Sequence, residues 1–124
     1  VIPAVDAYGL GMLPFFPLAM GMLTGKVTRD GGAPEGTRLH GRDGYLTDSK
    51  FDRVEALGAW GEEHGRSLLE IAIGGLAAQP TVSSVIAGAT SPDQVRQNAA
   101  AGEWEPTEQD LEEIDRLAPT MSPR

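Results

Sequence analysis

The chain has 124 residues, of which 40% are hydrophobic and 23% are charged, a composition typical of a soluble globular domain. Its net charge of −8 at pH 7 argues against a nucleic-acid partner, because a phosphate backbone would be repelled. The absence of cysteine excludes disulfides, thiolate chemistry and cysteine-based metal sites, and no apolar run approaches membrane-spanning length. We therefore expect a cytoplasmic protein that binds neither nucleic acid nor a membrane.

The first third of the chain changes from apolar to glycine-rich. Residues 1–6 are typical of the tail of a helix or a strand, whereas residues 12–17 predict a buried strand, because each of their two prolines favours an extended backbone at the residue before it. Residues 18–26 predict an apolar loop or a single helical turn. Residues 25–44 contain six glycines and no hydrophobic periodicity, so we expect a long irregular loop, which in compact domains is usually functional or disordered.

Three later segments have helical patterns. A helix is expected from residue 48 to about residue 64, because apolar residues recur there at every third position. A second helix over residues 67–79 opens with a Ser-x-x-Glu capping box, and a third begins after Thr107.

Both His40 and His64 are expected to be exposed, and neither has a second ligand at helical spacing that would support a metal site. The residues expected in the core are Phe51, Trp60, Leu69 and Ile73.

One stretch combines a strand, a turn of small residues and the start of a helix. The β-branched residues of 82–86 predict a short buried strand, and the Gly-Ala pair at 88–89 leaves the backbone open to a ligand. A capping box over Ser91–Gln94 then opens a helix expected over residues 92–101. The free N–H groups and the dipole of such a helix start favour an anion such as phosphate, although this pattern alone more often marks an ordinary helix start.

The predicted order of elements is strand, loop, two helices, strand and two helices. Strands that are each followed by helices indicate an α/β protein with a parallel sheet. Two strands do not make a stable parallel sheet, so the chain is expected to be a fragment or a processed piece of a larger fold.

Two motifs resemble one known family. Residues 15–26, which read FFPLAMGMLTGK, resemble the segment at the end of the seventh barrel strand of aldo-keto reductases, with the pattern aromatic-Ser-Pro-Leu-x-x-Gly-x-Leu-Thr-Gly-Lys. Residues 86–98, which read IAGATSPDQVRQN, resemble the eighth strand and helix, with the pattern Gly-Ala-Ser/Thr-x-x-x-Gln-x-x-Glu/Gln-Asn. Their order and separation match as well, and the chain is most similar to the bacterial branch that resembles potassium-channel β subunits.

The resemblance implies a (β/α)8 TIM barrel, a fold of ~250 residues. Residues 1–124 are then the C-terminal part of the barrel, comprising its last two βα units and the C-terminal helix. In such barrels the loops after strands seven and eight commonly form a phosphate site, which agrees with the reading of the helix start above. The resemblance also places Trp104 against the floor of the barrel.

Further expectations concern activity. The resemblance implies a parent protein that is an NADP-dependent aldo-keto reductase and reduces a small aldehyde or ketone by hydride transfer. Its catalytic Asp, Tyr, Lys and His lie on earlier strands in the family, so no catalytic residue is assigned in this chain. Two alternatives stay open: a non-catalytic, regulatory module that binds a nicotinamide dinucleotide, and a truncated product without activity. Exposed sheet edges predict that the chain either packs against the upstream remainder of the barrel or self-associates.

The resemblance assigns cofactor contacts residue by residue. The residues expected to line the pyrophosphate are Pro17, Leu18, Ala19 and Gly21. Lys26 is expected to reach a phosphate, and Arg38, on a loop that resembles the flap over the cofactor, to lie near the adenosine 2′-phosphate. The residues expected to hold the adenosine half are Gly88, Thr90, Gln94, Gln97 and Asn98. Phe16 departs from the pattern, because many relatives have a serine there that hydrogen-bonds the cofactor.

Overall fold

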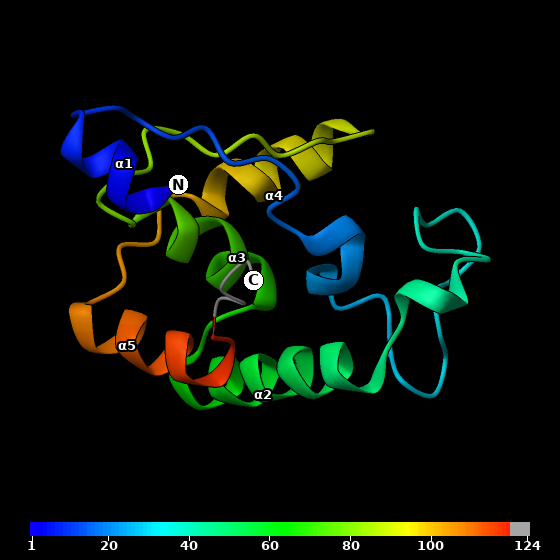
Figure 1. Ribbon diagram of the computed structural model, residues 1–124. Helices are drawn as coiled ribbons and strands as arrows, with labels where there is room; N and C mark the ends of the chain where they lie inside the picture. The colour runs from blue at the N-terminus through cyan, green and yellow to red at the C-terminus, as the bar shows by residue number, and fades with distance from the viewer. Residues whose placement is uncertain (120–124) are drawn as a thin grey trace.

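Helices form the regular secondary structure of the computed structural model, which describes residues 1–119. In chain order the elements are α1 (Ile2–Ala7), η1 (Ala19–Thr24), η2 (Asp43–Tyr45), α2 (Asp48–His64), α3 (Leu68–Ala77), α4 (Pro92–Ala101) and α5 (Glu108–Leu117), η1 and η2 being 3-10 helices. The third helix, α3, contacts α2, α4 and η1, while α5 packs against α2 (Figure 1). No helix of the described residues is long and apolar enough to cross a membrane.

The helix ends follow the capping signals of the sequence. At the start of α3, the Ser67 hydroxyl accepts a hydrogen bond from the Glu70 amide, and the Glu70 carboxylate accepts one from the Ser67 amide, so the predicted capping box is present. Helix α2 ends at Gly65, whose φ of 65° lies in the left-handed region that glycine adopts readily. Helix α5 begins after Thr107, which forms a capping box with Asp110.

The two predicted buried strands are wrong in extent and in burial. Residues 12–15 and 82–86 run side by side in the parallel direction, but in the described part of the chain they form only isolated bridges, Met12 to Val82 and Phe15 to Ile86 (Figure 1). Proline lacks an amide hydrogen, so Pro14 cannot donate to the ladder. The pairing is irregular, because the two bridges are three residues apart in the first segment and four residues apart in the second. The exposed fractions of Phe15 and Ile86 are 68% and 54%, because no described element covers these side chains.

Two clusters of buried side chains hold the chain together. We call the first the helix cluster, and its members are Leu57, Trp60, Ile71 and Trp104. The second, the loop cluster, consists of Met22, Val27, Leu39 and Phe51. The predicted core residues Phe51, Trp60 and Ile73 are buried, but Leu69 is only partly buried and lines a pocket. The indole rings of Trp60 and Trp104 lie 6.2 Å apart, so within the described residues Trp104 packs on helices.

The long loop is irregular, as predicted, but it is firmly anchored. Leu39 is completely buried and Val27 is 4% exposed, so both ends of the loop insert apolar side chains into the loop cluster. Arg29 joins the loop to α2, because its guanidinium donates hydrogen bonds to Asp48, Asp52 and Glu55 at 2.6–3.0 Å. The segment between these anchors, residues 36–38, reaches the pocket described next.

Candidate functional site

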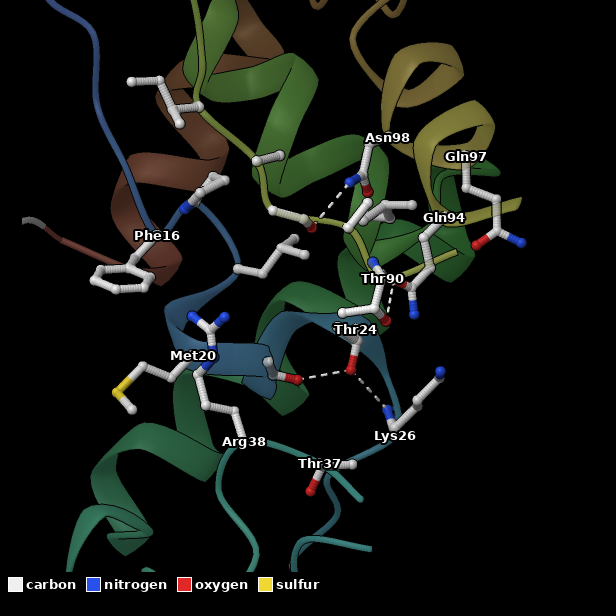
Figure 2. Close-up of a pocket in the computed structure, with 18 of the residues that line it drawn as sticks. Phe16, Met20, Thr24, Lys26, Thr37, Arg38, Thr90, Gln94, Gln97 and Asn98 are labelled. Atoms are coloured by element: carbon white, nitrogen blue, oxygen red, sulfur yellow. Dashed lines mark hydrogen bonds between the residues drawn. The ribbon is translucent and has the colours of Figure 1, made fainter. Parts of the chain in front are cut away.

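A pocket of about 810 Å³ lies between parts of the chain that are far apart in sequence (Figure 2). Residues 15–26 form one wall, residues 86–98 form a second wall, and residues 36–38 of the loop contribute a third side. The volume lies within the range of ~300–1,000 Å³ that is usual for small-molecule and cofactor sites. Folding therefore brings the two motifs of the sequence to one cavity.

Most of the residues predicted to bind a cofactor line this pocket. Those that do are Pro17, Leu18, Gly21, Lys26, Arg38, Gly88, Thr90, Gln94, Gln97 and Asn98. Ala19 does not line it and instead is partly buried against the loop cluster. The structure brings these residues together, and their contacts with a cofactor stay a prediction.

Other residues line the pocket without having been predicted. They are Phe15, Met20, Thr24, Gly36, Thr37, Leu69, Ile86 and Ala87, together with Phe16, which had been noted only as a departure from the family pattern. Ala89, whose backbone was expected to be open to a ligand, lines the pocket as well. The sequence held a signal for some of them, since they adjoin predicted residues within the same motifs. It held none for Leu69, whose helical spacing is that of a core residue.

The backbone of the first wall adopts an unusual conformation. Phe16, Ala19 and Met20 have φ values of 57°, 47° and 59°, in the left-handed region that non-glycine residues seldom adopt. Gly21 has a φ of 109°, and its position is one that only glycine adopts without strain. The Thr24 hydroxyl donates to the Gly21 carbonyl at 2.6 Å and accepts from the Lys26 amide, which closes the turn. Such conformations cluster at ligand sites and cost ~1–3 kcal/mol each.

In the second wall, side chains of α4 hold the turn at residues 88–90. The Gln94 side-chain oxygen accepts hydrogen bonds from the amide and the hydroxyl of Thr90 at 2.7 and 3.1 Å, and the Asn98 amide donates to the Gly88 carbonyl at 3.4 Å. The predicted capping box is thus half correct. The Ser91 hydroxyl accepts from the Gln94 amide at 3.3 Å, but the glutamine reaches back to residue 90 instead of the N-cap. One N–H group that we expected to be offered to an anion is therefore used by the cap.

The charge of the pocket is positive although the chain as a whole is acidic. Lys26 and Arg38 line it, and no aspartate or glutamate of the described residues does so. Figure 2 shows Arg38 on the side where Phe16 and Met20 lie, and Lys26 on the other side of Thr24. The Gly88 backbone is open, since a Cβ placed there would meet no atom within 4 Å. Cations, small residues and open backbone suit an anionic ligand.

A metal centre is not indicated. In the part of the chain that the structure describes, no group of three or more histidine, aspartate or glutamate side chains is placed to hold an ion. The expectation that both histidines are exposed is confirmed, and His64 also stacks on Trp60 with ring centroids 4.0 Å apart.

Comparison with known proteins identifies the family. The model of the aldo/keto reductase family matches residues 1–119. The chain belongs to this family. Membership confirms the resemblance drawn from the two motifs, and it implies a TIM-barrel fold and a family of oxidoreductases that generally uses a nicotinamide cofactor.

Several curated proteins are similar to the chain. It is 37% identical over 107 residues to a probable voltage-gated potassium channel subunit beta of Oryza sativa subsp. japonica, an alignment that covers 81% of the chain and 32% of the relative. It is 32% identical over 102 residues to the L-glyceraldehyde 3-phosphate reductase of Escherichia coli O157:H7, covering 75% and 29%. A third relative, the NADH-specific methylglyoxal reductase of Escherichia coli K12, is 29% identical over 104 residues, covering 82% and 31%. The chain thus spans about a third of the length of these relatives.

Proposed function

We propose that residues 1–124 form the cofactor-binding part of an NADP-dependent aldo/keto reductase that reduces a small aldehyde or ketone. In this proposal the extended segments 12–17 and 82–86 correspond to the last two strands of the barrel, each followed by its helices. The observation that carries the proposal is the convergence of the two family motifs on one cationic pocket. The parallel direction of the two bridges supports the assignment of the strands.

The residues present fit a nicotinamide dinucleotide. Its pyrophosphate is an anion, and the pocket offers Lys26 and Arg38 without a competing carboxylate among the described residues. Its bases and riboses need room and hydrogen-bonding groups, which the volume of about 810 Å³ and the amides of Gln97 and Asn98 supply. When bound, the nicotinamide ring supplies the hydride for carbonyl reduction. The chain's own contribution is to hold and orient the dinucleotide.

We prefer NADP to NAD as the cofactor for an electrostatic reason. NADP carries one further phosphate on the adenosine ribose, and a protein selects it by placing cationic groups there and leaving carboxylates out. Both conditions hold for the pocket. One relative is named as NADH-specific, so the choice differs between relatives and needs a measurement in this protein.

The exposed apolar residues indicate what the chain packs against. Leu13, Phe15, Ile86 and Val95 have exposed fractions between 54% and 68%, which is unusual for side chains of their size. Family membership implies a barrel, and the relatives are about three times as long as the matched part. We propose that the upstream remainder of the barrel covers these residues. Self-association of the chain would be the outcome where that remainder is missing.

A second candidate is a regulatory module that binds the dinucleotide without catalysis. It is favoured by the similarity to relatives named as potassium channel β subunits. The two candidates share the pocket and differ in turnover. Reduction of a panel of aldehydes by the full encoded protein with NADPH supports the reductase, whereas binding of NADPH without turnover supports the regulatory module.

The experiment that tests cofactor choice replaces Arg38 by alanine. The full encoded protein and its R38A variant are titrated with NADP⁺ and with NAD⁺, and binding is followed by quenching of tryptophan fluorescence. Loss of a charge-assisted contact worth ~1.5–3 kcal/mol weakens NADP⁺ about ten- to a hundredfold, while NAD⁺ binding barely changes.

The matched control is R96A. It removes the same charge from α4 at a side chain that is 74% exposed, outside the pocket, and paired with Asp93. We expect R96A to bind both cofactors like the wild type. Equal weakening of both cofactors in R38A would show that Arg38 does not read the 2′-phosphate, and no weakening would show that the loop does not cover the site.

A further inference from the structure

Two pocket residues from different segments contact each other. The Cζ atom of Arg38, on the loop, lies over the Phe16 ring at 5.4 Å from its centroid. A guanidinium within ~6 Å of a ring centroid is attracted by the negative face of the π-system. Both residues line the pocket, so this attraction acts where a ligand would bind (Figure 2).

Phe16 occupies a position that is unusual for its type. Its φ of 57° is an outlier for a bulky side chain, and its exposed fraction is 53%, so core packing does not account for it. The family pattern described above has a serine there, whose hydroxyl can hydrogen-bond the cofactor directly. A phenylalanine ring has no such donor, and any contribution it makes to anion binding has to pass through another residue.

We propose that Phe16 is a positioning residue that holds the Arg38 guanidinium over the pocket before the ligand arrives. The ring attracts the cation through its face and leaves the N–H groups of the guanidinium for a phosphate of the dinucleotide. Arg38 is an exposed residue on a loop, and a side chain that is already held in place loses less rotamer freedom on binding. This inference rests on the proposed function, because it needs a phosphate-bearing ligand in the same pocket.

A double-mutant cycle on the full encoded protein tests the pair. F16L keeps an apolar side chain of similar reach but has no π-face, and we expect it to weaken NADP⁺ about two- to fivefold. In an R38A background the same F16L change should have no further effect. F16Y, which keeps the ring, should bind like the wild type. Affinities are measured by calorimetric titration with NADP⁺ and with NAD⁺, so that the result does not depend on turnover.

The neighbouring Phe15 supplies a matched control. It also lines the pocket, and its ring centroid lies 5.0 Å from that of Phe16, but the Arg38 guanidinium lies over the Phe16 ring and not over that of Phe15. Whatever F15L does to affinity should be the same with and without Arg38. Urea midpoints of all variants confirm that they are folded.

The outcomes separate this inference from the function on which it rests. Coupling between Phe16 and Arg38 with NADP⁺ alone assigns Arg38 to the 2′-phosphate, and coupling with both dinucleotides assigns it to the pyrophosphate; either result supports the pair. Binding by the wild type with additive effects of F16L and R38A, or an equal loss in F16L and F16Y, overturns the positioning role and leaves the proposed function standing. If the wild type binds neither dinucleotide, the proposed function itself fails.

Discussion

The helix cluster and the pocket are built in opposite ways. In the helix cluster Trp60 is 6% and Trp104 is 9% exposed, and the Trp60 indole donates to Glu113 at 2.7 Å, so apolar surface is buried and the polar atom is satisfied. Around the pocket, Phe15 and Ile86 are more than half exposed and several non-glycine residues have positive φ. The first region stabilises the chain, whereas the second, in our proposal, presents groups to a ligand and to the remainder of the barrel.

This difference has a physical origin. Burying a large side chain contributes ~1.5–3 kcal/mol, whereas a left-handed backbone at a non-glycine residue costs ~1–3 kcal/mol. Strain at the pocket can therefore persist only because packing elsewhere offsets it. Mutations should accordingly change stability when they touch the helix cluster and binding when they touch the pocket.

The largest effect on stability is expected from a substitution that disrupts the close packing at the end of α2. A Cβ added at Gly61 would overlap the carbonyl oxygen of Arg66 and lie 3.1 Å from Ile71, so G61A forces the backbone apart. We expect it to lower the free energy of unfolding by ~1–3 kcal/mol, as overpacking does. The measurement is urea denaturation of the full encoded protein followed by circular dichroism.

Gly58 is the matched control for this substitution. It lies on the same helix, and a Cβ there would meet no atom within 4 Å. G58A should stabilise the protein by ~0.5–1 kcal/mol, because alanine loses less backbone entropy than glycine in a helix. If both variants shift the midpoint in the same direction, the contact of Gly61 with residue 66 is not what limits the packing.

The helical region was largely predictable from sequence because its signals are local. Helical periodicity correctly indicated that Phe51, Trp60 and Ile73 are buried. The same periodicity was wrong for Leu69, since only tertiary structure decides that one side of α3 faces a cavity. Likewise, no local pattern shows that Leu39, in an irregular loop, is completely buried.

A second, smaller effect is expected in the pH dependence of the stability of the helical region. Hydrogen bonds from the Ser67 and Thr107 amides hold the pKa of Glu70 and of Asp110 below their ordinary values. A carboxyl whose pKa is lowered on folding contributes stability that is fully present above its unfolded pKa and is lost as the pH falls through the folded value. We therefore expect the helical region to lose stability progressively below about pH 4.

The variant E70Q isolates one of these groups. Glutamine can still complete the capping box but does not titrate, so the fall in urea midpoint between pH 7 and pH 3 should be smaller than in the wild type. The control is E63Q, at an exposed glutamate of α2, which should follow the wild-type curve. Identical curves for E70Q and the wild type would show that this carboxylate does not contribute to the acid transition.

The pocket was predictable for a different reason. Its residues come from segments with no shared periodicity, and only the resemblance of two motifs to one family placed them together. The resemblance predicted Lys26 and Arg38 as site residues but did not predict the lengths of the strands. The two expected strands are reduced to isolated bridges, because an amide is missing at Pro14 and a neighbouring strand is missing from the described chain on either side.

The smallest expected effect concerns Arg29, which joins the pocket loop to the helical region. Its guanidinium donates to three carboxylates, of Asp48, Asp52 and Glu55, but these are between 54% and 92% exposed, and exposed ion pairs contribute little to global stability. We expect R29Q to leave the urea midpoint unchanged. Hydrogen exchange should instead detect local opening at the Gly32 amide, which donates to the Thr28 carbonyl at 2.8 Å. Its exchange rate should rise by a factor of about five at most.

The salt dependence of exchange distinguishes anchoring of the loop by ion pairs from anchoring by buried side chains. Raising the salt concentration screens the Arg29 pairs, so exchange at Gly32 should become faster in the wild type and approach the rate of R29Q, whose own rate should be insensitive to salt. R53Q, which removes a guanidinium from α2 that makes no ion pair with the described residues of the loop, should keep the wild-type salt response. An equal salt response in R29Q and the wild type would mean that the buried side chains of Val27 and Leu39, and not the ion pairs, hold the loop over the pocket.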